Sequence, residues 1–129
     1  MTITEPLSAR EREILDIVYR LGEATATQVI AQMNGPPSRS AVRTFLKILE
    51  AKGHLQHTQV GREFVFCTTK SRDSVGRKAI SHVLDTFFGG SLSEAVASYL
   101  NRSRSNVDVA ELKKLQRLIE IARKRESKS

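Results

Sequence analysis

The sequence predicts a mainly α fold that carries one small β-hairpin. Apolar residues recur at helical spacing in six segments, and most of these segments begin at a serine, threonine or aspartate. Between residues 55 and 68 the period changes to alternation, with β-branched and aromatic residues on both sides of a glycine. Residues 1–70 hold nine basic and seven acidic residues, a net charge of +2, whereas residues 71–129 hold twelve and seven, a net charge of +5. We therefore expect two domains, residues 1–70 and residues 71–129.

Two capping-box patterns predict the first two helices. Ser8 with Glu11 begins the first helix, and Gly22 ends it. The inward side of this helix holds four apolar residues, which are Ile14, Leu15, Val18 and Leu21. Thr25 with Gln28 begins a second, shorter helix. The second helix buries Ala26, Val29, Ile30 and Met33, and the chain then breaks at Asn34-Gly35-Pro36-Pro37.

The third helix has the most informative pattern in the chain. It begins at the cap Ser38, ends at Gly53, and turns inward the apolar residues Val42, Phe45, Leu46 and Leu49. Its outward side holds two cations and two hydroxyls, with no carboxylate at the centre: Ser40, Arg43, Thr44 and Lys47. This set suits a helix in a DNA major groove, where Arg43 can bond guanine and Thr44 can contact thymine. The alternative interpretation is an ordinary amphipathic helix with a solvated face.

Two strands are predicted after the third helix. Residues 55–59 and 64–68 alternate, and residues 60–63 join them as a turn that contains Gly61. Three helices followed by a hairpin predict a winged helix-turn-helix domain, with the third helix in the major groove and the hairpin tip beside the DNA backbone. We expect phosphate contacts from Arg39, from Arg62 at the hairpin tip and from the helix terminus at Thr25. For Arg62 the alternative is a solvated turn charge.

Three more helices are predicted after residue 71. The first ends at Gly89-Gly90, the second begins at the cap Ser91, and the third begins at the cap Asp108. A segment of about 60 residues is marginal by itself, so its apolar stripes require a partner surface. We expect a two-fold homodimer held by nine apolar residues, the last three in a coiled-coil-like seam: Leu84, Phe87, Phe88, Leu92, Val96, Leu100, Leu112, Leu115 and Ile119. The alternative is that these helices fold back on the first domain as one monomeric core.

The composition limits the classes of partner. The chain has 129 residues, a formal net charge of +7 and a pI near 10.0, which favour a nucleic acid or an acidic membrane surface. No apolar stretch reaches the roughly 18 residues that span a bilayer. The start lacks the features of a secretion signal, and Cys67 is the single cysteine. We therefore expect a cytoplasmic protein without membrane insertion. Tryptophan is absent, which argues against binding of single strands by base stacking.

No set of residues predicts catalysis or a cofactor. The histidines do not recur at metal-ligand spacing, and no thiolate cluster accompanies them. No nucleophile stands with a base and an orienting acid, and no glycine loop could hold phosphate. Cys67 alternates with Phe66 in a predicted strand, where a small buried hydrophobe is a better interpretation than a redox sensor. We expect neither an enzyme nor a metal or cofactor site.

Five segments together carry a resemblance over nearly the whole chain, from about residue 7 to residue 122. They are Leu7–Glu11, Ala24–Val29, Val42–Leu46, Gly61–Phe66 and Phe87–Leu92. In their order and spacing they resemble the penicillinase-repressor family, which includes BlaI/MecI-type repressors and copper-responsive CopY-type repressors. The resemblance implies a dimeric transcriptional repressor that binds palindromic operators in double-stranded DNA.

The resemblance also extends to single residues. Arg43 and Thr44 look like the family's operator-reading pair, whereas Ser40 and Ala41 stand where the family often has lysine and threonine. Ile48 stands where the family commonly has arginine. These departures make the chain similar to a divergent member, whose operator sequence does not follow from the resemblance.

Two branches of the family suggest different signals. In the antibiotic-responsive branch, a sensor-linked protease cuts the dimerisation segment, and the matching bond here is Ser98–Tyr99. The usual Asn-Phe pair is absent from that bond, so the resemblance does not extend to the residues on either side of it. The copper-responsive branch has a cysteine-rich tail, whereas residues 120–129 contain no cysteine, which disfavours copper sensing.

Two other classes of function remain open. A winged-helix protein-interaction module would dock an acidic protein, although protein interfaces prefer aromatic anchors to the hydroxyls that flank Arg43. A non-specific architectural DNA binder would show a steep salt dependence and little sequence preference.

Overall fold

The computed structural model describes residues 6–102 and 107–128. The chain divides into two compact units whose boundary falls between Ala79 and Ile80, inside a helix. The predicted domain boundary at residue 70 stays a prediction. The elements in order are α1 (Ala9–Leu21), β1 (Glu23–Ala24), α2 (Ala26–Gln32), α3 (Arg39–Ala51), β2 (Leu55–Val60), β3 (Glu63–Thr68), α4 (Arg72–Phe87), α5 (Leu92–Leu100) and α6 (Val109–Ser127).

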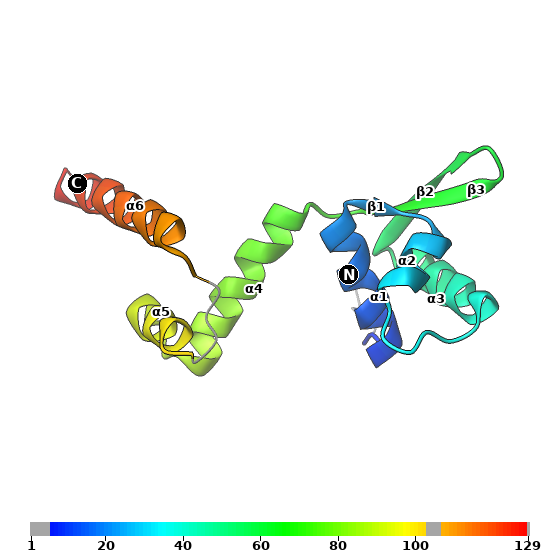
Figure 1. The fold of residues 1–129 in the computed structure, drawn as a ribbon, viewed down its shortest axis with the longest axis horizontal. Helices are drawn as coiled ribbons and strands as arrows, with labels where there is room; N and C mark the ends of the chain where they lie inside the picture. Colours follow the sequence, from blue (N-terminus) through cyan, green and yellow to red (C-terminus); the bar gives the residue numbers. More distant parts are fainter. Residues whose placement is uncertain (1–5, 103–106, 129) are drawn as a thin grey trace. The chain divides into compact units, whose positions relative to one another are not determined.

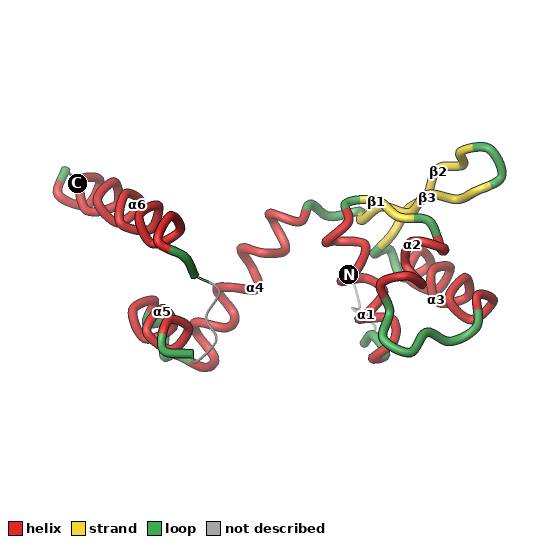
Figure 2. Tube along the Cα trace, viewed as in Figure 1, coloured by secondary structure: helices red, strands yellow, loops and turns green. Residues whose placement is uncertain are grey.

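The first unit combines three helices with a small antiparallel sheet of strand order β1-β3-β2 (Figures 1 and 2). The hairpin of β2 and β3 extends beyond the helices as a wing, so the predicted winged helix-turn-helix is confirmed. Strand β1 was not predicted. It pairs Ala24 with Phe66 and Glu23 with Cys67, and thus ties the α1–α2 connection to the wing.

Each helix of the first unit begins at its predicted cap. The Ser8 hydroxyl accepts the Glu11 amide at 3.1 Å, and the Ser38 hydroxyl accepts the amide three residues later at 3.1 Å. Thr25 and Gln28 form a complete capping box, because each side chain accepts the other residue's backbone N–H. These local signals therefore set the starting points of all three helices.

A single core holds the first unit together. Its buried apolar residues come from all three helices and all three strands: Ile14, Leu15, Ile17, Val18, Ala24, Val29, Met33, Val42, Leu46, Leu49, Leu55 and Phe66. The prediction that Leu21 faces inward is wrong, because its side chain is 44% exposed. Leu21 is the last residue of α1 and lies beyond the core, and Ile17, one turn earlier, is buried in its place.

The wing is a tight hairpin. Strands β2 and β3 each extend one residue further toward the turn than predicted, which leaves Gly61 and Arg62 as its two central residues. Gly61 has a φ of 64°, a conformation that glycine adopts without strain. The turn therefore presents the exposed Arg62 at the end of the wing.

The second unit has little core of its own. The predicted caps Ser91 and Asp108 are confirmed, since each side chain accepts the amide three residues later. In the described parts of α4, α5 and α6, no residue is buried. Among the described residues, no helix has the length and apolar character needed to cross a membrane.

Candidate nucleic-acid interface

Helix α3 separates its two faces sharply. Val42, Leu46 and Leu49 are fully buried against the core. The five predicted DNA-facing residues of this helix are exposed: Arg39, Ser40, Arg43, Thr44 and Lys47. The core thus fixes the rotation of α3 about its axis, and the cations and hydroxyls are turned to solvent.

Basic side chains from α3 and from the wing converge on one hollow. It has a volume of about 290 Å³, and its cationic lining consists of Arg39, Arg43, Lys47 and Arg62. The other lining residues come from the start of α2 and from the wing: Thr25, Ala26, Thr27, Glu63, Phe64 and Phe66. Ser40 and Thr44 lie outside this lining. The hollow therefore suits a polyanion that runs between α3 and the wing.

Some of the predicted DNA-contacting residues already form hydrogen bonds within the chain, and others do not. Arg39 donates to the Thr27 hydroxyl at 2.9 Å, which joins α3 to α2. The Thr44 hydroxyl donates to the Ser40 carbonyl at 3.0 Å, so only its lone pairs and methyl group remain for a ligand. Within the part of the chain that the structure describes, Arg43 and Lys47 form no hydrogen bond or ion pair.

Thr25 acts first as a helix cap. Its hydroxyl accepts the Gln28 amide at 3.2 Å, and its own amide donates to the Gln28 side chain at 2.9 Å. The side chain lines the hollow, but its oxygen is already used by the backbone. A phosphate contact at Thr25 remains a prediction.

Contacts that were not predicted from the sequence join the wing to the C-terminal turn of α3. His57 Nδ1 on β2 lies 2.6 Å from Glu50 Oε1 on α3. The His57 ring stacks on Phe64, with 4.3 Å between ring centroids, and lies 5.5 Å from Phe66. These contacts hold the wing that carries Arg62 in a defined position beside α3.

An ion pair ties the end of α3 to the start of α1. Lys52 Nζ donates to Glu11 at 2.7 Å and to the Pro6 carbonyl at 3.2 Å. The Lys52 ammonium, followed by the Ser8 hydroxyl, lowers the pKa of the Glu11 carboxyl below its usual value. Because both side chains are largely shielded from solvent, this pair fixes the C-terminal end of α3.

The predicted dimer residues lie in the second unit, and several of their large apolar side chains are exposed to solvent. Phe87 is 72% exposed, Leu92 59% and Ile119 56%. Val96, Leu100 and Leu112 are exposed to a smaller degree, whereas Leu84, Phe88 and Leu115 are partly covered. Three further apolar residues of α6, which were not among those predicted, are also exposed: Val109, Leu118 and Ile121.

The proposed cleavage bond lies within helix. Ser98 and Tyr99 belong to the last turn of α5, where the Asn101 amide donates to the Ala97 carbonyl at 3.0 Å. Tyr99 is half-exposed, and the Arg102 guanidinium lies over its ring, 5.1 Å from the ring centroid. The backbone at this bond is therefore helical in the folded chain.

The hollow beside α3 is the candidate binding surface of the first unit. Among the described residues, no group of three or more histidine, cysteine, aspartate or glutamate side chains could hold a metal ion. Cys67 is half-buried on β3, where it faces Gln56 and Glu23 across the sheet. The hollow beside α3 brings together cations and hydroxyls for a polyanionic ligand.

A family model described as "Penicillinase repressor" matches residues 7–121 of this chain. The chain belongs to the penicillinase repressor family. Its members are transcriptional repressors without enzymatic activity, and they bind operator DNA as dimers. This penicillinase repressor family protein is therefore a DNA-binding transcriptional regulator.

No curated protein matches this penicillinase repressor family chain. It is similar to a solved structure described as "Mechanism for regulation of DNA binding of Bordetella bronchiseptica BpsR by 6-hydroxynicotinic acid", at 16% identity and a TM-score of 0.48. The match covers 95% of this chain and 80% of that one. It is too distant to carry an inference about function or ligands.

Proposed function

We propose that the protein is a cytoplasmic, homodimeric repressor that binds palindromic operators in double-stranded DNA. The observation that carries this proposal is the exposed cationic face of α3, whose opposite face is fully buried in the core. Such a helix is held by the domain core and turns cations and hydroxyls outward, where they could contact base edges in a major groove.

Four residues of α3 are proposed to face the bases: Ser40, Arg43, Thr44 and Lys47. Arg43 has no side-chain partner among the described residues, so its guanidinium could bond both acceptors of a guanine. Because the Thr44 hydroxyl already donates to Ser40, it would accept a hydrogen bond from a base amino group. Phosphate contacts are assigned to Arg39, Arg62 and Thr25, which share the hollow between α3 and the wing.

Dimerisation is assigned to the second unit. Its helices contain no buried residue among those described, while several of their large apolar side chains are exposed. A two-fold axis would let one patch cover its own copy. The patch comprises Leu84, Phe87, Phe88, Leu92, Val96, Leu100, Leu112, Leu115 and Ile119. Two linked recognition helices would then read half-sites about one helical turn, roughly 34–36 Å, apart.

Relief of repression by cleavage at Ser98–Tyr99 is a further part of the proposal. A protease requires an extended backbone, so the last turn of α5 would first have to open. A sensor-linked protease would be the partner that acts there. Mass spectrometry of the protein from induced cells would detect the fragment that ends at Ser98, and an intact chain under every inducing condition would refute this step.

The test of operator recognition is selection from a randomised duplex pool at about 0.15 M salt, where phosphate contacts are already weakened. We expect enrichment of a two-fold symmetric motif by the wild-type protein. The Arg43→Ala variant is compared with the wild-type protein in the same selection, because it removes a proposed base contact and leaves the core intact.

Other outcomes would favour the competing functions. Salt-sensitive binding without an enriched motif would indicate a non-specific architectural DNA binder. Failure to bind duplex DNA at all would favour a module that docks an acidic protein.

A further inference from the structure

The connection that leads into α3 is irregular, and two of its residues have no backbone N–H donor. It runs from the end of α2 at Gln32 to the start of α3 at Arg39 and contains Pro36 and Pro37, which have no N–H group. Gly35 has a φ of 56°, in the left-handed region. The regular hydrogen bonds of a helix or sheet therefore do not fix the conformation of this segment. Contacts with another element have to do so.

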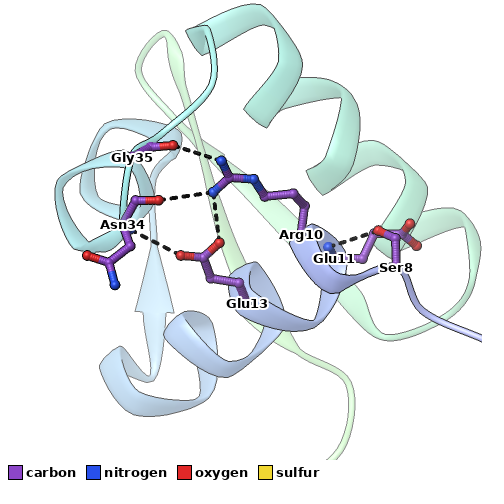
Figure 3. Close-up of polar contacts among 6 residues, drawn as sticks. All are labelled: Ser8, Arg10, Glu11, Glu13, Asn34 and Gly35. Atoms are coloured by element: carbon purple, nitrogen blue, oxygen red, sulfur yellow. Dashed lines mark hydrogen bonds and ion pairs between the residues drawn. The ribbon is translucent and has the colours of Figure 1, made fainter.

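Two side chains of α1 supply that support (Figure 3). The Arg10 guanidinium donates to the Asn34 carbonyl at 3.2 Å, to the Gly35 carbonyl at 2.8 Å and to Glu13 Oε1 at 3.0 Å. The second oxygen of Glu13 accepts the Asn34 amide at 3.1 Å. We call these four contacts the Arg10–Glu13 clamp.

The clamp uses the specific geometry of its side chains. A guanidinium directs several N–H groups in one plane, so Arg10 can reach two carbonyls and a carboxylate at the same time. The Asn34 amide, followed by Arg10, lowers the pKa of the Glu13 carboxyl, so this group is ionised at neutral pH. The clamp joins residues 21 to 25 positions apart in sequence, and both side chains are partly shielded from solvent.

We propose that Arg10 and Glu13 are positioning residues for operator recognition. This inference rests on the proposed function. The clamp ends at Gly35, three residues before the cap Ser38, so it fixes the connection that leads into α3 and thereby how the first turns of α3 approach DNA. Those turns carry Ser40 and Arg43.

Base contacts and phosphate contacts respond differently to a shift of α3. Bidentate bonding to a base edge needs correct distance and direction, whereas long cationic side chains follow a phosphate over a wide range of positions. Loss of the clamp therefore lowers specific affinity more than non-specific affinity. A clamp that merely stabilised the fold would affect the two affinities equally.

The test compares Arg10→Met and Arg10→Lys with the control Arg12→Met. Arg12 is an exposed cation on the same helix, so the control removes the same charge but leaves the clamp intact. Affinities are measured for the selected duplex and for a random duplex at the same salt concentration. We expect Arg10→Met to lose roughly ten-fold on the selected duplex and to match the control on random DNA. Arg10→Lys should be intermediate, because an ammonium cannot reach all three acceptors.

Amide hydrogen exchange provides a readout that needs no DNA. In Arg10→Met, and to a lesser degree in Arg10→Lys, exchange should accelerate at Asn34, Ala41 and Val42 but not at the core residue Leu46. Unchanged exchange at these amides, or equal losses on both duplexes, would overturn the proposal. If the wild-type protein selects no motif, the proposed function fails, and the exchange result alone decides whether the clamp positions α3.

Discussion

Replacement of Phe87 by serine should dissociate the proposed dimer. Phe87 is the last residue of α4, and 72% of it is exposed in the single chain. Because so little of the ring is covered within its own chain, a partner surface has most of its apolar area available to bury. Serine removes that area without placing a charge in the second unit.

The size of the effect follows from the exposed fraction. Full burial of a phenylalanine side chain is worth about 1.5–3 kcal/mol, and 72% of that leaves about 1–2 kcal/mol for each copy. A two-fold interface contains the residue twice, so the dimer should lose about 2–4 kcal/mol. Since a tenfold change corresponds to about 1.4 kcal/mol, the dimer dissociation constant should rise roughly 30- to 1000-fold.

Sedimentation velocity over a range of protein concentrations measures this constant directly. Val60→Ser is the matched control, because Val60 is similarly exposed, at 65%, but belongs to the wing. We expect the control to associate like the wild-type protein. If Phe87→Ser associates as tightly as the control, the face of α4 that carries Phe87 is not part of the interface, and the inference from its exposure is refuted.

Four further predictions concern the first unit. Arg43→Ala should cost about 1–3 kcal/mol on the selected duplex, with a smaller loss on random DNA, in a titration of both. Arg62→Ala should reduce the salt dependence of binding, with a change in slope of about 1 because Arg62 is assigned to phosphate, as measured by titration at several salt concentrations. Leu46→Ala should destabilise the unit by about 2–5 kcal/mol in denaturant unfolding, because the side chain is fully buried. Glu13 has a folded-state pKa below its usual 4.5, so its contribution to stability is present above that pH and disappears as the pH falls through the folded value. The melting temperature of Glu13→Gln should therefore be lower than that of the wild-type protein at neutral pH. In acid the two melting temperatures should converge.

The features that could be predicted from the sequence are those encoded locally. Ser38 and the Thr25–Gln28 pair mark helix starts through bonds that span three residues, so a short stretch of sequence contains the whole signal. The outward direction of Arg43 followed in the same way from the helical spacing of its apolar neighbours, and the buried Leu46 confirms it.

The features that the sequence did not reveal depend on distant pairing. Strand β1 has only two residues, and it exists because Ala24 lies opposite Phe66 in the folded unit. The Arg10–Glu13 clamp similarly needs the α2–α3 connection to lie against α1. Arg10 and Glu13 could be paired by their spacing along a helix, but nothing in that spacing indicates the carbonyls that they also reach.

The unequal distribution of buried residues has a consequence for regulation. All buried residues of the described chain lie in the first unit, so that unit has a core without a partner. The helices of the second unit would gain their core only in the proposed dimer, so their stability would depend on protein concentration. Operator binding through two linked copies of α3, as proposed, would depend on that same association. A signal that disturbs only the second unit, such as cleavage in α5, would therefore weaken operator binding while leaving the DNA-facing side chains of α3 unchanged.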